Sequence, residues 1–413
     1  MREEWVKIEY KKLVDKISTT KKKIKQREYN ISGKVPIVDQ GQELIGGFTN
    51  DETKILDCNL PVIIFGDHTK IIKIVNFSFA PGADGTKVLQ PKTFILPQLL
   101  AHFTQIIVHK IKDKGYARHY QHVEKQHLGI PPLPEQRAIV AKIEELFGSL
   151  DSGVAELKAA KEKLEIYRQA VLKKAFEGEL TENNDMEWIK LGEVCENVQY
   201  GTSSKSLKKG KIPVLRMGNI QKGNIDWNNL AYTNNDEEIE KYRLYNNDVL
   251  FNRTNSPEWV GKTAIYRGEK PAIFAGYLIR VNYKKNLVVG DYLNYFLNSH
   301  IAKVHGNKVK SFGVNQSNIN GTKLKKYPFP LTTIDLQLQI VQEIETRLSV
   351  CDKIMETIDE SLEQAEALRQ SILKKAFEGE LLSESELETC RKEPDWEPAE
   401  KLLERIKKEK KKS

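Results

Sequence analysis

Two long stretches of the chain, 135–178 and a counterpart that ends at 379, carry apolar residues at seven-residue intervals and contain no proline. A seven-residue pattern held this long is typical of a coiled-coil seam rather than of a helix in a globular core. The seam positions of the first stretch are Val140, Phe147, Val154, Lys161, Arg168 and Ala175, together with Ile143, Leu150, Leu157, Leu164 and Val171. Those of the second are Val341, Leu348, Met355, Leu362, Arg369 and Ala376, together with Ile344, Cys351, Ile358, Ala365 and Ile372. The pattern predicts two helices, each roughly 65 Å long at about 1.5 Å per residue.

The ends of these helices are also marked in the sequence. Gly178 and Gly379 stand where a helix C-terminus favours glycine, and Pro134 stands where the first turn tolerates proline. Arg168 and Arg369 occupy equivalent seam positions. Parallel pairing would bring these like charges together, whereas antiparallel pairing keeps them apart. We therefore expect an antiparallel intramolecular coiled coil.

The two helices are near-copies of one another. "LKKAFEGEL" occurs at 172–180 and again at 373–381, and nineteen of the 47 positions in 134–180 match their partners 201 residues later. A fainter echo pairs "EWVKI" at 4–8 with "EWIKL" at 187–191. Repetition on this scale indicates two half-units built on one plan.

The stretches that precede the helices lack the seven-residue pattern. They carry short β-branched and aromatic runs between Gly and Asn turns, such as "LPVIIFGDH" and "FAGYLIRVNY", which are typical of strands. Each also holds one helical stretch, "QLLAHFTQIIVHKI" in the first and "DYLNYFLNSHIAKV" in the second. We therefore predict the α+β class, with two globular α/β domains whose sheets are antiparallel or mixed.

The predicted organisation has five segments. They are a first globular domain at 1–133, a central helix at 134–181, a second globular domain at 182–333, a C-terminal helix at 334–381 and a basic tail at 382–413.

A second apolar pattern lies off the helix seam. Leu172 with Phe176, and Leu373 with Phe377, are four residues apart on the outer face of each helix. Two interpretations are open at this point. The pairs pack against the adjacent globular domain, or they form a docking patch for another subunit that occurs twice.

Composition limits the partners and the compartment. The 413 residues include 65 Lys and Arg against 57 Asp and Glu, so the net charge of +8 permits nucleic acid as a partner without requiring it. The four cysteines show neither CxxC nor zinc spacing, which indicates free thiols in a reducing compartment. The sequence has no apolar run of membrane-spanning length and no signal-peptide core, so we expect a cytoplasmic protein without a membrane partner.

Polar residues suited to reading DNA gather in the loop-like stretches of both globular domains. Arg and Lys match guanine edges and phosphates, and Asn and Gln match adenine, although Asn-rich stretches are also ordinary turn chemistry. As a set on the loops of a basic protein, they predict DNA binding. The candidates are Gln40, Gln42, His68, Arg118, His119, Tyr120, Lys205, Lys208, Arg216, Asn219, Asn252, Arg253, Asn255, Asn315 and Gln316.

Motifs for catalysis are missing from the sequence. "GADGTK" at 82–87 lacks the spacing of a Walker A motif, and "NSPEW" at 255–259 departs from the amino-methyltransferase motif at Glu258. His119, His122 and His127 have no Cys or carboxylate cluster nearby to complete a metal site. We expect no catalytic residue, no metal and no cofactor in this chain.

Several segments resemble one known family. "PPLPEQRAIVAKIEELF" at 131–147 and both copies of "LKKAFEGEL" resemble the helical conserved regions of type I restriction-modification specificity subunits. "YPFPLTTIDLQLQIVQEIE" at 327–345 is similar to the first motif and keeps Gln337 in the place of Gln136. "GKIPVLRMGNIQ" and "DVLFNRTNSPEWVGKTAIY" resemble one class of target-recognition domain, and "GKVPIVDQGQELIGGFTND" with "FGDHTK" resembles another.

The resemblance implies a role for each part of the chain. Each target-recognition domain would read one half of a split double-stranded DNA sequence, and the paired helices would act as a ruler. The helices would also bind two modification subunits, and restriction subunits would complete the complex. S-adenosylmethionine, ATP and Mg²⁺ are expected on those partner subunits rather than here.

Two alternatives share the same sequence features. One is a tandem-domain coiled-coil scaffold that binds proteins rather than DNA. The other is an enzyme whose active site carries no familiar motif.

Overall fold

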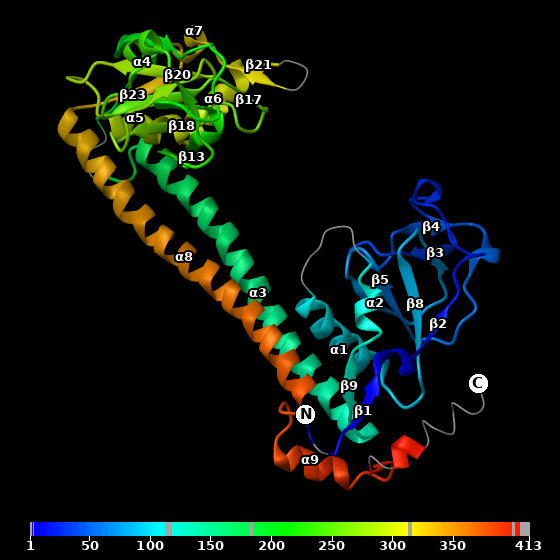
Figure 1. Ribbon diagram of the computed structural model, residues 1–413. Coiled ribbons are helices and arrows are strands. Elements are labelled where there is room, and N and C mark those ends of the chain that lie inside the picture. The colour runs from blue at the N-terminus through cyan, green and yellow to red at the C-terminus, as the bar shows by residue number, and fades with distance from the viewer. Residues whose placement is uncertain are drawn as a thin grey trace. The chain divides into compact units, whose positions relative to one another are not determined.

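The computed structural model describes residues 2, 4–111, 118–181, 185–312, 316–398 and 401–404. They form two compact units, of which unit 1 is Met1–Leu157 with Glu360–Ser413 and unit 2 is Lys158–Asp359. Each unit holds one globular domain and part of two long helices, α3 (Leu133–Phe176) and α8 (Ile334–Glu378). Figure 1 shows α3 and α8 running side by side.

The globular domain of unit 1 is built on two small sheets and a strand pair. A four-stranded antiparallel sheet has the order β2-β8-β5-β6, and a three-stranded mixed sheet has the order β4-β3-β7. The strands are β1 (Val6–Glu9), β2 (Val14–Ile17), β3 (Val35–Val38), β4 (Gly47–Thr49), β5 (Val62–Gly66), β6 (Ile72–Val75), β7 (Ala80–Pro81), β8 (Thr86–Pro91) and β9 (His127–Ile130). The helices are α1 (Pro97–Lys110) and α2 (Tyr120–Val123), and α9 (Glu384–Arg391) follows the end of α8.

Unit 2 repeats this plan with additions. Its four-stranded antiparallel sheet has the order β11-β20-β16-β18, and its three-stranded mixed sheet has the order β15-β12-β19. The core strands are β10 (Glu187–Lys190), β11 (Cys195–Tyr200), β12 (Ile212–Leu215), β15 (Ala231–Thr233), β16 (Asp248–Asn252), β18 (Thr263–Tyr266), β19 (Ile273–Phe274), β20 (Leu278–Tyr283) and β23 (Pro328–Leu331). Short strands are added as β13 (Ile220–Gln221), β14 (Asn224–Ile225), β17 (Thr254–Asn255), β21 (Ser311–Phe312) and β22 (Ser317–Asn318). The helices are α4 (Asp236–Tyr242), α5 (Gly290–Asn298), α6 (His300–Val309) and α7 (Gly321–Leu324).

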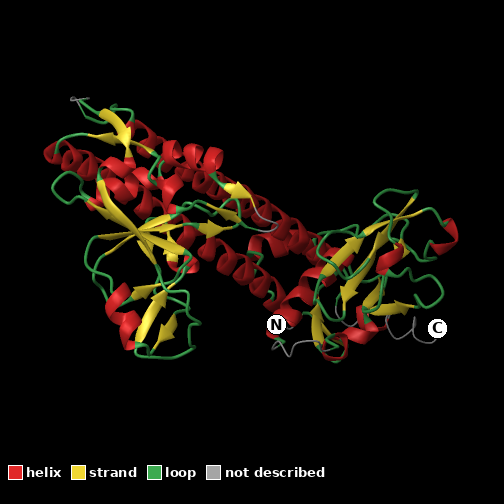
Figure 2. Cartoon of the chain, turned by 90° about the horizontal axis from the view of Figure 1, so that it is seen from above, coloured by secondary structure: helices red, strands yellow, loops and turns green. Residues whose placement is uncertain are grey.

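The two domains therefore share one topology despite their dissimilar sequences. In both, the central strand of the three-stranded sheet pairs parallel with one neighbour, β3 with β7 and β12 with β19. In both, the first and last strands pair antiparallel, β1 with β9 and β10 with β23. Figure 2 shows the strands gathered in the globular domains and the long helices outside them. The predicted α+β class with mixed sheets is confirmed.

One predicted helix is two helices in the structure. The stretch "DYLNYFLNSHIAKV" is divided into α5 and α6 at Ser299, whose backbone is extended. The Ser299 hydroxyl accepts a hydrogen bond from the backbone N–H of Ala302 at 3.4 Å, which caps the start of α6. A serine within an apolar helical pattern gave the only local sign of this break.

The two long helices pair antiparallel, as the sequence predicts. In unit 2, Lys161 forms an ion pair with Asp359 and Arg168 with Asp352, so later residues of α3 meet earlier residues of α8. In unit 1, Arg369 forms the equivalent ion pair with Asp151. Each seam arginine thus faces an aspartate of the other helix, which is the charge separation that the antiparallel prediction required.

Both helices also end in the same way. Gly178 has a φ of +80° and Gly379 a φ of +81°, the left-handed region that favours glycine. The backbone N–H of Glu179 donates to the carbonyl of Lys174 at 2.9 Å, and that of Glu380 donates to Lys375 at 2.8 Å. The glycine C-caps expected from the sequence are confirmed.

The off-seam apolar residues are part of the chain's own cores, so the predicted docking patch is wrong. Leu172 and Phe176 are buried in unit 2, where the Phe176 ring meets Tyr292 and Phe296 at centroid distances of 5.2 and 5.3 Å. Leu373 is buried in unit 1, and the partly buried Phe377 ring lies 5.3 Å from Phe103. A side chain buried against its own domain cannot present itself to another subunit.

This packing explains why the nine-residue stretch occurs twice. The copy that ends α3 packs on the globular domain of unit 2, together with the start of α8 at Leu336 and Ile340. The copy that ends α8 packs on the globular domain of unit 1, together with the start of α3 at Ile139 and Val140. Each globular domain therefore sits on the start of one long helix and the end of the other.

Candidate functional site

A buried glutamine joins each long helix to its globular domain. The side-chain oxygen of Gln136 accepts a hydrogen bond from the backbone N–H of Leu96 at 2.8 Å, and its Nε2 donates to the carbonyls of Phe94 and Pro131 at 2.9 Å. Leu96 is the N-cap residue of α1. Because the amide satisfies three backbone groups at once, it fixes the start of α1 against α3.

Gln337 makes the same three hydrogen bonds in unit 2. Its oxygen accepts from the backbone N–H of Val289, the N-cap residue of α5, at 2.8 Å. Its Nε2 donates to the carbonyls of Leu287 and Thr332, both at 2.8 Å. The second copy of the motif has lost the Leu-Pro-Glu sequence yet keeps the whole clamp, because one glutamine side chain makes every contact.

Two predicted DNA-contacting residues of unit 1 come together at the turn after β7. Gln40 Nε2 donates to the carbonyl of Asp84 at 2.9 Å, and its Oε1 accepts from the backbone N–H of His68 at 3.3 Å. Gly85 lies beside them with a φ of +91°, and a Cβ there would stand 2.7 Å from both side chains. The Gln40 amide is therefore occupied in shaping the loop. A base contact by Gln40 or His68 remains a prediction.

His119 and Tyr120 are buried, and the prediction that they contact DNA is wrong. The carbonyl of Asp67 accepts from the backbone N–H of His119 at 2.9 Å, and its Oδ1 accepts from that of Tyr120 at 2.9 Å. The Tyr120 ring packs against Phe65 with centroids 5.6 Å apart, and burial raises the pKa of its hydroxyl to about 12. These two residues anchor a loop in the core.

Asn219 and Asn252 of unit 2 are also buried, and neither contacts DNA as predicted. Asn219 Oδ1 accepts from the backbone N–H of Arg216 at 2.9 Å, and its Nδ2 donates to the carbonyls of Asp226 and Asn228. Both of its amide N–H donors and one lone pair of its Oδ1 are used within the loop. Neither side-chain amide atom of Asn252 has a partner among the described residues, and neither is accessible from outside.

Arg253 occupies a more open position at the end of β16. Its guanidinium lies over the ring of Tyr200 at 5.0 Å, and its NH1 donates to the carbonyl of Gly276 at 3.0 Å. The neighbouring Tyr277, whose carbonyl accepts from the backbone N–H of Arg253, is exposed. Stacking and one carbonyl contact hold the guanidinium plane rigid, which is the arrangement that bidentate recognition of guanine favours.

The remaining candidates are accessible or lie outside the described residues. The exposed ones are Gln42, Arg118, Lys205, Lys208, Arg216 and Gln316, and Asn255 is half-buried. Arg216 also donates to the carbonyl of Asn229 at 2.7 Å. Asn315 lies outside the described residues. DNA contact by the accessible set stays a prediction.

Sequence reasoning missed the exposed aromatic residues beside these cations. Tyr200 and Tyr277 lie around Arg253, and the exposed Trp259 carries Lys262 Nζ over its ring at 3.9 Å. Exposed aromatic rings next to cations can stack on bases and contact phosphates. The available signal was "NSPEW", an aromatic residue inside a polar turn, which we had considered only as a failed catalytic motif.

Comparison with known proteins finds similarity to one family. The family model described as "Type I restriction modification DNA specificity domain" matches residues 183–364. The type I restriction enzyme EcoKI specificity subunit of Escherichia coli (strain K12) is 28% identical over 343 residues, which cover 78% of this chain and 74% of that protein. The StySPI specificity subunit of Salmonella potsdam is 28% identical over 339 residues, covering 78% and 73%.

Type I restriction-modification specificity subunits are therefore the family that this chain resembles.

Solved structures agree with this fold. A chain from a study of complex assembly and conformational transition of the type I R-M system has a TM-score of 0.70 at 19% identity, covering 92% of this chain and 99% of its own. The HsdS subunit from Thermoanaerobacter tengcongensis has a TM-score of 0.53 at 18% identity, covering 92% and 98%. The architecture of this chain is therefore shared with both.

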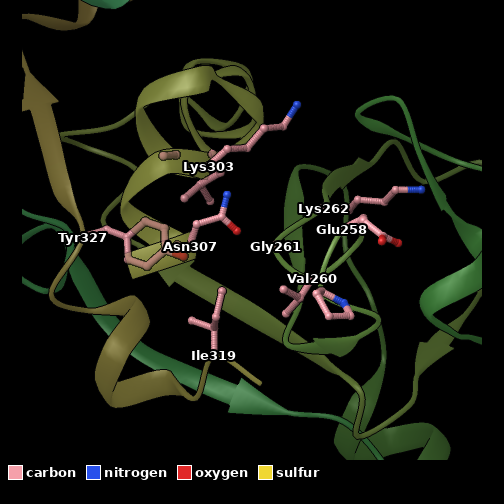
Figure 3. Close-up of a pocket in the computed structure, with 12 residues that line it drawn as sticks. Glu258, Val260, Gly261, Lys262, Lys303, Asn307, Ile319 and Tyr327 are labelled. Carbon is pink, nitrogen blue, oxygen red and sulfur yellow. The ribbon is translucent and has the colours of Figure 1, made fainter. Parts of the chain in front are cut away.

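One cavity in unit 2 is lined by α6, the loop before β18 and the residue after β22. Its volume is about 110 Å³. Figure 3 shows Val260, Ile319 and the Tyr327 ring facing it, whereas the ends of Lys262 and Lys303 point away. Lys303 Nζ instead donates to Gln169 on α3 at 3.3 Å. A cavity this small does not have the size of a cofactor site.

Within the described residues, no group of three or more His, Cys, Asp or Glu side chains is placed to hold a metal ion. No helix in the same residues has the length and apolar character needed to cross a membrane.

Proposed function

We propose that this chain reads a double-stranded DNA target in two halves, one half with each globular domain. The observation that carries the proposal is the pair of domains with one topology, each held by the same glutamine clamp, whose loops carry unrelated residues. A shared frame with different loops supports two unlike half-sites. The excess of 65 basic over 57 acidic residues supports DNA as the partner.

The paired helices would set the spacer between the half-sites. The helix α3 contains 44 residues and α8 contains 45, which corresponds to roughly 65 Å at about 1.5 Å per residue. Two domains fixed to rigid helices read sites at a fixed interval, whereas a flexible linker would tolerate many intervals.

The proposal includes two modification subunits as partners, and the structure offers a replacement for the rejected docking patch. Tyr167 on α3 is 45% exposed and Leu368, which stands 201 residues later on α8, is 50% exposed. Large exposed apolar residues at equivalent positions are suited to bind two copies of one protein. We assign methyl transfer, S-adenosylmethionine, ATP and Mg²⁺ to the partner subunits, and no catalysis to this chain.

The deciding experiment is methylome sequencing of cells that express this chain with its modification subunit. We expect one split motif with a fixed spacer. Replacing 187–330 with the equivalent domain of a relative should change one half-site and leave the other half intact. A change in both halves, or no methylated motif in cells where the complex assembles, would reject the division of labour.

Native mass spectrometry tests the stoichiometry. Tyr167→Glu and Leu368→Glu should each remove one modification subunit, and the double variant should remove both. Ala159→Glu, at another exposed position of α3, is the matched control and should keep both. If the double variant folds and still binds two subunits, the docking surface lies elsewhere.

A further inference from the structure

The C-terminal segment covers one face of unit 1. Within the residues that the structure describes, this segment comprises α9, the turn that follows it and residues 401–404. Arg391 forms an ion pair with Glu4 at 2.8 Å, and Asp395 forms one with Arg137 at 2.7 Å. Leu402 lies beside Phe94. Trp5 is only 5% exposed and Phe94 only 1%, and both belong to the hydrophobic cluster that contains Leu387 and Leu402 of this segment.

The equivalent face of unit 2 can be located residue by residue. Trp188 corresponds to Trp5. The Trp188 ring lies 6.4 Å from the Phe296 ring, just as the Trp5 ring lies 6.5 Å from the Phe103 ring. Leu287 corresponds to Phe94, because both carbonyls accept from the clamp glutamine. Leu338 corresponds to Arg137 through the repeat of 201 residues.

These three residues of unit 2 form what we call the open face. Trp188 is 49% exposed, Leu287 is 37% exposed and Leu338 is 50% exposed. No described segment plays the part that α9 plays in unit 1, because α3 leads directly through residues 177–181 and 185–186 to β10. Three large apolar residues exposed at positions that are covered in the sister unit indicate a surface that lacks its cover.

The charge around the open face excludes a copy of α9 as that cover. In unit 1, the acids Glu384, Glu386 and Asp395 meet Arg2, Lys142 and Arg137. The corresponding residues of unit 2 are Asp185, Glu343 and Leu338. An acidic segment would therefore meet the Asp185 carboxylate, a Glu343 carboxylate that already pairs with Arg347, and a leucine, where it finds three cations in unit 1.

The same residues favour a basic occupant. Glu187 corresponds to Glu4, which pairs with Arg391 in unit 1, and no ion pair of Glu187 occurs among the described residues. Asp335 and Asp185, adjacent to the apolar residues in sequence, are exposed. Carboxylates at the rim of an apolar patch are complementary to lysine or arginine beside leucine-type residues.

We propose that the open face binds a short amphipathic helix of a partner protein, with leucine-type residues toward Trp188, Leu287 and Leu338 and with Lys or Arg toward Glu187 and Asp185. This helix takes the place that α9 holds in unit 1. The open face contains neither Tyr167 nor Leu368, the residues of the docking surface proposed above. It makes the two units inequivalent, because the covered face of unit 1 is closed to the same helix.

A redesigned peptide from this chain provides a defined probe. The peptide spans 380–404 and carries three substitutions. Glu384→Lys places a cation toward Asp185, Glu386→Lys places one toward Glu343, and Asp395→Leu places an apolar side chain toward Leu338. The unaltered peptide is its control. With fluorescent labels on both, fluorescence anisotropy with the full chain should show at least tenfold tighter binding of the redesigned peptide.

A reciprocal variant of the protein sharpens the test. Leu338→Arg introduces the residue type that unit 1 has at this position, Arg137. It should therefore weaken binding of the redesigned peptide at least tenfold. It should strengthen binding of the unaltered peptide, whose Asp395 can pair with the new arginine. Leu338 is half exposed, so this change should leave folding intact, which circular dichroism checks. Val350→Arg, at another apolar position of α8 that is 54% exposed, should change neither affinity.

Any one of three results would overturn the proposal. The first is equal binding of the two peptides, and the second is a Leu338→Arg variant whose affinities for both peptides are unchanged. The third is light scattering that shows full-length chains dimerising through residues 380–404, because a second copy would then be the occupant. None of these outcomes bears on DNA reading, because the methylome experiment has a separate readout.

Discussion

Units 1 and 2 share the arrangement that holds the globular domain on a long helix, and they differ in the residues around that attachment. Both use a buried glutamine to hold the globular domain on a long helix, with the same three hydrogen bonds. The residue before the glutamine is Glu135 in unit 1 and Leu336 in unit 2, and both are buried. The repeat therefore conserves the attachment of domain to helix, whereas the surroundings of the clamp differ.

The difference at this position is electrostatic. Trp5 Nε1 donates to Glu135 Oε2 at 2.9 Å, while Oε1 has no partner among the described residues. Burial raises the pKa of the Glu135 carboxyl, and the hydrogen bond from Trp5 together with the nearby Arg2 and Arg391 opposes the rise. Unit 1 pairs its tryptophan with a buried acid under a C-terminal cover, and unit 2 leaves its tryptophan open beside a leucine.

The largest effect should come from charging the aromatic residue that ends α3. Phe176→Asp places a carboxylate in the core of unit 2 without a partner, which should cost about 5 kcal/mol or more of unfolding free energy. The partly buried Phe377 has Lys110 Nζ 5.1 Å above its ring, so Phe377→Asp should cost clearly less. Denaturant unfolding measures both variants. Equal losses would mean that the two contacts are equivalent after all.

The clamp glutamines should show the next largest effect, and the two units should respond alike. Gln136→Leu and Gln337→Leu each strand one N–H and two carbonyls, which should cost about 3 kcal/mol at about 1 kcal/mol per group. Chemical denaturation provides the measurement, and Gln342→Leu at an exposed position of α8 is the control. If only one of the two variants lost unfolding free energy, the same hydrogen-bond geometry would contribute differently to stability in the two units.

Glu135 should give unit 1 a pH dependence that unit 2 lacks. A carboxyl whose pKa is raised by folding contributes stability below its unfolded pKa, and this contribution is lost as pH rises through the folded value. The stability gained by Glu135→Gln should therefore grow as the pH rises above about 4, the ordinary pKa of a glutamate carboxyl. Urea unfolding across this pH range tests it, with Leu336→Gln as the pH-independent comparison. A flat difference would show that Glu135 is not perturbed.

The equivalent ion pairs of the two helices should give the smallest effect. The aspartates of the pairs Arg369 with Asp151 and Arg168 with Asp352 are exposed, so Asp151→Asn and Asp352→Asn should each cost less than about 1 kcal/mol. Arg369 also lies 4.3 Å over the ring of Phe147, so Arg369→Ala should cost about 0.5 kcal/mol more than Arg168→Ala. Thermal denaturation in low and high salt separates the two contributions, because stacking is less sensitive to salt. A larger loss of stability for Arg168→Ala than for Arg369→Ala would contradict a stabilising contact between Arg369 and the Phe147 ring.

Local periodicity predicted the parts of this protein whose contacts repeat along the chain. The seven-residue pattern, the duplicated stretch and the glycine C-caps were enough to define α3 and α8, and the like charges of Arg168 and Arg369 predicted the direction of pairing. These features follow from helix geometry, in which each residue meets neighbours at known intervals. The order of domains and helices could be predicted for the same reason.

Only the tertiary structure decided which polar and apolar residues are available to partners. Phe176 and Leu373 have the spacing of an outer helical face, yet a globular domain that is distant in sequence covers them. Asn219, Asn252, His119 and Tyr120 have the chemistry of DNA contacts, yet loops fold over them. Burial depends on which surfaces meet across long sequence separations, and neither residue type nor spacing records that. For the same reason, the sequence determined the frame of this protein, and packing determined its exposed surface.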